Sequence, residues 1–119
     1  MLQERVRAWC KTGENCSGII LRAAAEEYGI HLSEDILSAC KGVQSGFGVG
    51  SFCSGLAAAV MVLGLLFDED TVKTKRIQFL FRIQEQFGSL NCCRLSLLGE
   101  DCEEFLAQAG DILQKIIEE

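Results

Sequence analysis

Apolar residues along the chain mostly recur every three to four positions, the spacing that places side chains on one face of an α-helix. The clearest example is the last segment, whose apolar stripe is formed by Phe105, Ala109, Ile112 and Ile116. No segment alternates between apolar and polar residues for long, and there is no Asn-Gly or Asp-Gly hairpin signal. The pattern predicts an all-α protein, a compact bundle of five to six helices in a single domain over residues 1–119.

Residues that favour helix starts and ends divide this pattern into segments. The expected helices are a short one before the KTGEN stretch, one over about 16–28 that Gly29 ends, one that Ser33 caps, one over about 52–67, one over about 68–87 that Gly88 ends, and one over about 101–117. Between the third and fourth lies KGVQSGFGVGS, with four glycines in eleven residues, which predicts a loop or a tight turn.

The segment FCSGLAAAVMVLGLLF, residues 52–67, is the most apolar part of the chain. It is only sixteen residues long and includes Ser54, Gly55 and Gly64, so it is short for a membrane span. We therefore predict a buried central helix and no membrane association.

The net charge of −6 adds one feature to this picture. Seven acids and a single base, Lys115, lie between Glu100 and Glu119. Nucleic-acid binding would need a basic face, which the sequence lacks, so we expect no nucleic-acid partner. The acidic end predicts a solvated helix face, with a basic protein partner as the alternative.

Seven cysteines are more than a chain of this length usually contains, and an odd number does not suit complete pairing. The opening MLQERVRAWC is charged and has no apolar stretch, so we expect no signal peptide and a cytoplasmic protein. In a reducing cytosol such cysteines point to metal binding or thiol chemistry more often than to structural disulfides. The motifs CxxC, CxxCH and HExxH are absent.

Four of the cysteines follow a residue that favours the N-cap of a helix. The pairs are Asn15 before Cys16, Ser51 two residues before Cys53, Asn91 before Cys92, and Asp101 before Cys102. Each of these cysteines is expected in the first turn of a helix, where backbone N–H groups and the helix dipole favour a thiolate. We predict that the four converge on one site, with Cys93 as the alternative to Cys92, whereas Cys10 and Cys40 lie on apolar faces and are expected in the core.

The order of these motifs resembles a family of small bacterial and archaeal redox-active proteins named for a CGCAxxGCC cysteine pattern. GENCSGIILRAAAEEYGI is similar to the opening helix of that family, GSFCSGLAAAVMVLGL to its glycine-rich entry and apolar helix, and FGSLNCCRL to its FGSxxCR segment. Cys102, followed by an amphipathic helix, matches the last cysteine. After the central cysteine the family has Gly-Ala-x-x-Gly, where this chain has Ser54-Gly55-Leu56-Ala57-Ala58. The resemblance implies redox activity or a bound cluster.

Three hypotheses follow for the function. The first is electron transfer or redox sensing through an iron–sulfur cluster or another thiolate-bound metal, zinc included, held by Cys16, Cys53, Cys92 and Cys102. The second is thiol–disulfide chemistry without metal. The third is a helical protein-binding module with incidental cysteines. A redox partner protein is expected under the first two, and enzymatic activity and a homo-oligomer are left open.

Overall fold

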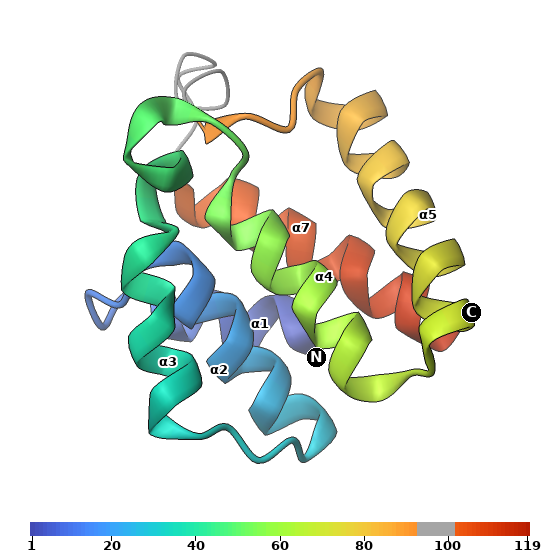
Figure 1. The fold of residues 1–119 in the computed structure, drawn as a ribbon, viewed down its shortest axis with the longest axis horizontal. Helices are drawn as coiled ribbons and strands as arrows, with labels where there is room; N and C mark the ends of the chain where they lie inside the picture. The colour runs from blue at the N-terminus through green and yellow to red at the C-terminus, as the bar shows by residue number, and fades with distance from the viewer. Residues whose placement is uncertain (93–101) are drawn as a thin grey trace.

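Helices account for nearly all of the regular structure in a computed structural model of the protein (Figure 1), which describes residues 1–92 and 102–119. In chain order the elements are α1 (Leu2–Cys10), α2 (Cys16–Tyr28), α3 (Glu34–Ala39), the turns η1 (Cys40–Gly42) and η2 (Gly46–Gly50), α4 (Ser54–Leu66), α5 (Glu69–Phe87) and α7 (Cys102–Glu118). Within the described residues the only β pairing is an isolated antiparallel bridge between Phe52 and Asn91. The prediction of an all-α bundle is confirmed.

Several predicted helix ends coincide with their capping residues. The side chain of Asn15 accepts a hydrogen bond from the Gly18 N–H, and that of Ser33 accepts one from the Ile36 N–H. Gly29 and Gly88 end α2 and α5 in the left-handed conformation, with φ of 67° and 78°. Glycine adopts this conformation without a steric penalty, which explains why both helices stop there.

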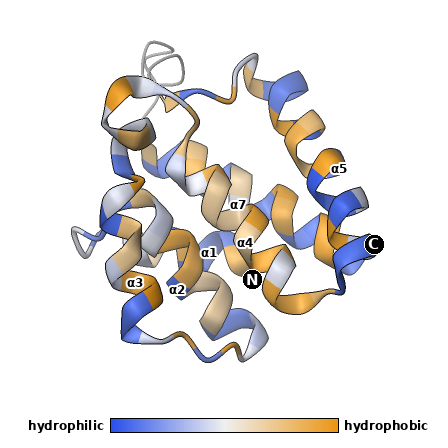
Figure 2. Ribbon diagram, viewed as in Figure 1, coloured by the Kyte–Doolittle hydropathy of each residue, from blue (hydrophilic) through white to orange (hydrophobic). Residues whose placement is uncertain are grey.

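The core is formed where α4 packs against α2, α5 and α7, while α1 packs between α2 and α7. Figure 2 shows that α4 has almost no hydrophilic residue along its length, whereas α5 is mixed. Leu56, Val62 and Leu63 of α4 are buried, which agrees with the predicted central helix. In the described residues no helix combines the length and the apolar character needed to cross a bilayer.

Helices α1 and α7 run antiparallel. The Leu2 N–H donates to Gln114 Oε1 at 2.8 Å, and further along α1 the Arg7 guanidinium bonds both Glu104 oxygens, at 2.9 Å and 3.3 Å. Between them Gly110 allows close approach, since a Cβ there would lie 3.0 Å from Val6 Cγ2. This register brings the end of α1 to the start of α7.

The glycine-rich segment forms the turn η2 rather than an open loop. Ser45 and Phe47 have φ of 59° and 65°, the left-handed region that side chains other than glycine rarely occupy. The Ser51 N–H bonds the Gly46 carbonyl at 2.9 Å, which closes the turn. The chain then becomes extended for the bridge at Phe52 and leads directly into Cys53.

Candidate functional site

Cys16 is the first residue of α2, as the sequence predicts. Asn15 Oδ1 accepts hydrogen bonds from the Gly18 N–H and from Ser17 Oγ, both at 2.9 Å. Gly18 and Ser17 are buried, so this capped first turn is fixed inside the protein, and Cys16 packs against the core.

Cys53 and Cys92 are brought together by backbone pairing. The Cys53 N–H bonds the Leu90 carbonyl at 2.9 Å, and the Cys92 N–H bonds the Ser51 carbonyl at 2.8 Å. Both bonds flank the Phe52–Asn91 bridge. Because side chains alternate along extended backbone, this pairing places Cys53 and Cys92 on the same side of the bridge, as diagonal neighbours.

The prediction that Ser51 caps the helix after Cys53 is wrong. Helix α4 begins at Ser54, and Cys53 itself occupies the N-cap position. The physical reason is the bridge, which keeps residues 51–53 extended and uses the Ser51 carbonyl to bind Cys92. No side-chain hydrogen bond caps α4 by the usual distance and angle. Burial raises the pKa of Cys53, and the N–H groups of Leu56 and Gly55, which face its sulfur, lower that pKa by a smaller amount.

The two remaining predicted starts lie at the edge of the described residues. Cys92 is helical and Asn91 directly precedes it, as expected of a cap, although the N–H groups that Asn91 would bind lie outside the described residues. Cys102 is the first described residue of α7 and is exposed. Asp101 and the alternative site cysteine, Cys93, also lie outside the described residues.

The four predicted cysteines lie close enough to influence one another. Burial is the main cause that raises the pKa of Cys16 to about 12, and charge on Cys53, Cys102 and Cys92 raises it further. Burial also raises the pKa of Cys53, and charge on Cys92 and Cys102 adds to the rise. In Figure 1 the starts of α2, α4 and α7 and the bridge lie toward the same end of the bundle. The structure therefore places Cys16 and Cys53 within electrostatic range of each other and of Cys92 and Cys102.

The expected lowering of thiol pKa values at helix starts does not hold for Cys16 or Cys53. Both pKa values are raised, because removal from water disfavours a thiolate more than the helix N-terminus favours it. Both groups are therefore mainly neutral thiols at pH 7.

Gly55 makes this close packing possible. A Cβ at Gly55 would lie 2.7 Å from Leu106 Cδ2, 3.6 Å from Cys16 Cβ and 3.7 Å from Cys53 Sγ. The first distance is too short for real atoms, so only glycine lets α4 approach α7 and α2 this closely. The small residue after the central cysteine thus has a packing role that its sequence position alone does not reveal.

The two cysteines expected in the core differ. Cys40 is 3% exposed and its sulfur lies 3.5 Å from the Ile36 carbonyl, so that prediction is confirmed. Cys10 is only partly buried at the edge of the core, and its charge is among the causes that raise the pKa of Cys16. The sequence missed this proximity, because the apolar stripe of a short helix does not show that its last residue borders another site.

A thiolate-bound metal requires at least three or four ligands converging on one point. Within residues 1–92 and 102–119, no three or more His, Cys, Asp or Glu side chains are placed to hold a metal ion. The thiol chemistry of the donor set suits a metal, but the described residues do not form a ready-made coordination shell.

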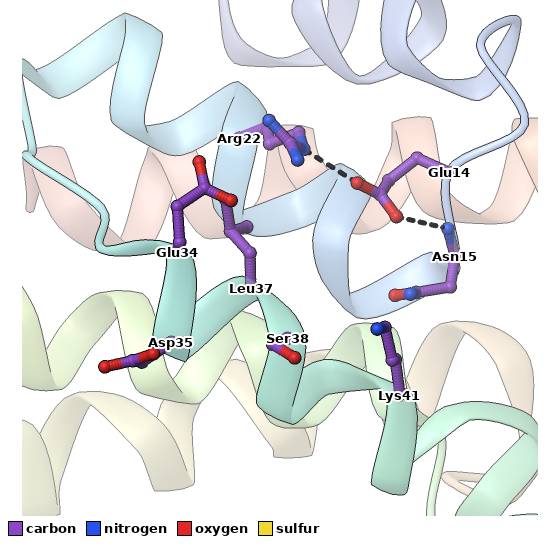
Figure 3. Close-up of a pocket in the computed structure, with 8 residues that line it drawn as sticks. All are labelled: Glu14, Asn15, Arg22, Glu34, Asp35, Leu37, Ser38 and Lys41. Carbon is purple, nitrogen blue, oxygen red and sulfur yellow. Dashed lines mark hydrogen bonds and ion pairs between the residues drawn. The ribbon is translucent and has the colours of Figure 1, made fainter.

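A cavity of about 420 Å³ lies elsewhere, between α2 and α3 (Figure 3). Its lining residues are Glu14, Asn15, Arg22, Glu34, Asp35, Leu37, Ser38 and Lys41. The Arg22–Glu14 ion pair, at 2.7 Å, crosses one side of it. No cysteine lines the cavity, so it is distinct from the thiol cluster.

An all-α bundle with several cysteines gathered at one end defines a class of small thiol proteins. The sequence profile of the family described as "Putative redox-active protein (C_GCAxxG_C_C)" matches residues 14–116, and the chain belongs to this family. The match includes Cys16, Cys53, Cys92 and Cys102 and excludes Cys10. Searches of curated proteins and of solved structures gave no significant match.

Proposed function

We propose that Cys16, Cys53, Cys92 and Cys102 act together as one redox site. The observation that carries this proposal is the packing of Cys16 and Cys53 around Gly55, together with the bridge that places Cys92 beside Cys53. Charge on each of the other three thiols accordingly raises the pKa of Cys16. Three cysteines from distant parts of the chain thus lie close enough to Cys16 to act on its sulfur, which isolated packing cysteines would not do. Membership of a redox-active family supports the same conclusion.

The chemistry that the geometry favours first is reversible thiol–disulfide exchange, because this needs only two adjacent sulfurs. The exposed Cys102 is the contact with a partner, whereas Cys53 is 6% exposed and Cys16 is partly buried. The Cys102 thiolate attacks a disulfide of the partner and releases one partner thiol. A second site thiol then attacks the Cys102 sulfur and releases the other. The partner disulfide is reduced to two thiols, and two site thiols become one disulfide.

Burial of the inner thiols is compatible with this scheme. A disulfide carries no charge, so the burial that opposes thiolates at Cys16 and Cys53 does not oppose the oxidised form. Thiols held reduced between cycles suit the cytosol, where we propose that the protein and its redox partner operate.

Binding of a metal, most simply an iron–sulfur cluster, is the second candidate. The observation that favours it is the number of converging thiols, since a disulfide uses two and a cluster or a zinc ion uses four. A bound cation would replace the proton on each thiol that it ligates, so metal binding would make thiolates of groups that burial otherwise keeps neutral. It ranks second because the described residues form no complete shell.

Analysis of protein purified without oxygen separates the two candidates. The measurements are iron, zinc and acid-labile sulfide content, followed by a count of reactive thiols before and after treatment with oxidised dithiothreitol. The exchange proposal expects little metal and the reversible loss of two thiols. Stoichiometric iron with sulfide, or zinc, would favour the second candidate instead.

A matched control is Cys40→Ala, which removes a buried thiol away from the site. This variant should lose the same two thiols on oxidation as the wild type. Metal-free protein whose thiols all resist oxidation in the folded state would contradict both candidates.

A further inference from the structure

The register of α1 against α7 gives Cys10 a defined neighbour. Near the start of α1, Leu2 contacts Gln114 of α7, and further along α1, Arg7 contacts Glu104, which lies nearer the start of α7. One turn after Arg7 on the same face of α1 is Cys10, and the antiparallel packing of the two helices brings it toward the beginning of α7. Helix α7 begins with Cys102.

The end of α1 is fixed in this position by contacts on two sides. Trp9 Nε1 donates to Glu26 Oε1 of α2 at 3.0 Å, and the Arg22 guanidinium lies 5.1 Å from the centre of the Trp9 ring. On the other side Arg7 pairs with Glu104 of α7. Cys10, next to Trp9 in the chain, is therefore held beside the thiol cluster.

Electrostatic effects agree with this placement. Charge on the Cys10 sulfur is among the causes that raise the pKa of Cys16, and it also contributes to the raised pKa of Arg7. The Cys10 sulfur is thus near both a site thiol and a guanidinium. A nearby cation favours the thiolate, which is the attacking form in disulfide exchange.

We infer that Cys10 is a fifth thiol of the redox site and is the residue that resolves a mixed disulfide at Cys102. The inference rests on the exchange chemistry proposed above. Cys102 attacks a low-molecular-weight disulfide, forms a mixed disulfide and releases one small thiol. The Cys10 thiolate then attacks the Cys102 sulfur, forms the Cys10–Cys102 disulfide and releases the second small thiol. Two electrons pass from the two cysteines to the small disulfide, and the protons of the cysteines pass to the released thiols.

Cys10 lies before the matched region of the family, residues 14–116, so this role is additional to the cysteines of the family motif. The proposed role of Cys10 also has a structural consequence of its own. A Cys10–Cys102 disulfide joins α1 to α7 and leaves Cys16 and the buried Cys53 reduced.

The test is the reaction of reduced full-length protein with hydroxyethyl disulfide, followed by acid quenching and disulfide mapping by mass spectrometry. Wild type should form the Cys10–Cys102 disulfide and release two small thiols for each disulfide formed. Cys10→Ser should retain the small thiol on Cys102 and lose the release of the second one. Cys10→Ala should behave likewise, and Cys40→Ala should match the wild type.

The outcomes distinguish this inference from the proposed function. If Cys10→Ser still releases both thiols, another cysteine resolves the mixed disulfide, and the inference fails while the exchange site stands. A Cys10 disulfide to any other cysteine also overturns the assigned pairing. If Cys102 does not react at all, the exchange proposal and the inference fail together. Circular dichroism of each variant checks that the helical fold is kept.

Discussion

At the scale of single residues, the thiol of Cys16 is subject to two opposing influences. The N-terminus of α2 favours its thiolate, whereas burial and the neighbouring sulfurs favour the neutral thiol and raise its pKa from 9.0 to about 12. A group with a raised folded-state pKa stabilises the protein below its unfolded pKa, and this stabilisation is lost as pH rises through the folded pKa. The free energy of unfolding of the reduced protein should therefore fall between about pH 9 and pH 12.

The Cys16→Ala variant should show a smaller fall over this range in denaturant unfolding at a series of pH values. Ionisation of Tyr28 adds a separate part of the fall in the free energy of unfolding. Burial raises the pKa of Tyr28 to about 12, and its hydroxyl is buried without a hydrogen-bond partner in the described structure. Tyr28→Phe is therefore the matched control and should remove a separate part of the fall. Equal pH dependence in Cys16→Ala and wild type would show that Cys16 ionises like an exposed thiol.

Two glycines of α4 offer a paired test of the site packing. Gly55→Ala places a Cβ 2.7 Å from Leu106 Cδ2, and Leu106 is buried and cannot turn away freely. Overpacking of this kind costs about 1–3 kcal/mol, and here it should also increase the reactivity of Cys16 and Cys53 toward alkylating reagents. Denaturant unfolding and thiol labelling are the measurements.

Gly64→Ala is the control, because a Cβ at Gly64 meets nothing within 4 Å. It should stabilise α4 by about 0.5–1 kcal/mol, as alanine does in an exposed helix position, and should leave thiol labelling unchanged. Equal effects of the two substitutions would mean that the close approach at Gly55 does not shape the site.

At this scale, the sequence predicts a structural feature when the residues that cause it are neighbours in the chain. The Asn15 cap and the helix start at Cys16 are predicted from two adjacent residues, and both predictions are confirmed. Ser51 was misassigned because its carbonyl pairs with Cys92, forty-one positions later, and local preferences contain no such information. The place of Cys10 likewise depends on the α1–α7 register, which no short motif encodes.

At the scale of elements, the cap of α2 should matter more for the thiols than other caps do. Asn15→Ala leaves the Gly18 N–H and the Ser17 hydroxyl without their acceptor and should cost about 1 kcal/mol. Loosening the first turn of α2 exposes Cys16, so the labelling rate of that thiol should rise. Denaturant unfolding and site-resolved labelling test both effects.

Ser33→Ala is the matched control, because Ser33 caps α3 through the Ile36 N–H at 3.2 Å and has no cysteine in the turn that it caps. A similar loss of stability is expected without any change in Cys16 labelling. A rise in Cys16 labelling in both variants would indicate general destabilisation rather than a local effect of the α2 cap.

The elements themselves were largely predictable, because periodicity and capping act within a few residues. The expected boundaries of α2, α5 and α7 agree with the structure to within one or two residues. The glycine-rich segment forms a tight turn, one of the two predicted forms, but Ser45 and Phe47 adopt left-handed backbone that the sequence does not suggest. The turn is stabilised by contacts with Ser51 and by the bridge that follows.

At the scale of the whole molecule, the acidic helix α7 shows what charge patterning can and cannot predict. The sequence predicts a solvated acidic face, yet Glu104 pairs with Arg7 and Glu119 with Arg82, both from other helices. Asp111 pairs with Lys115 within α7. These carboxylates are still exposed to solvent, so the acidic face is solvated as predicted, and part of its charge links α7 to α1 and α5 at the surface. The convergence of the four cysteines depends on such packing and was a hypothesis that the sequence alone could not test.

The final prediction concerns the four cysteines as a unit. The single substitution Cys102→Ser should remove most of the reversible oxidation, because this exposed thiol reacts first with an external disulfide. Cys16→Ser and Cys53→Ser should shift the midpoint of that oxidation, because their sulfurs lie close enough to influence Cys102. Residues that act as a unit are not additive, so pairwise combinations should add little further loss. Cys40→Ser, away from the cluster, should keep the redox response and lose only stability, because it places a hydroxyl in the core. The measurement is thiol loss and recovery across a series of redox buffers; independent losses that sum in the double variants would show separate thiols rather than one site.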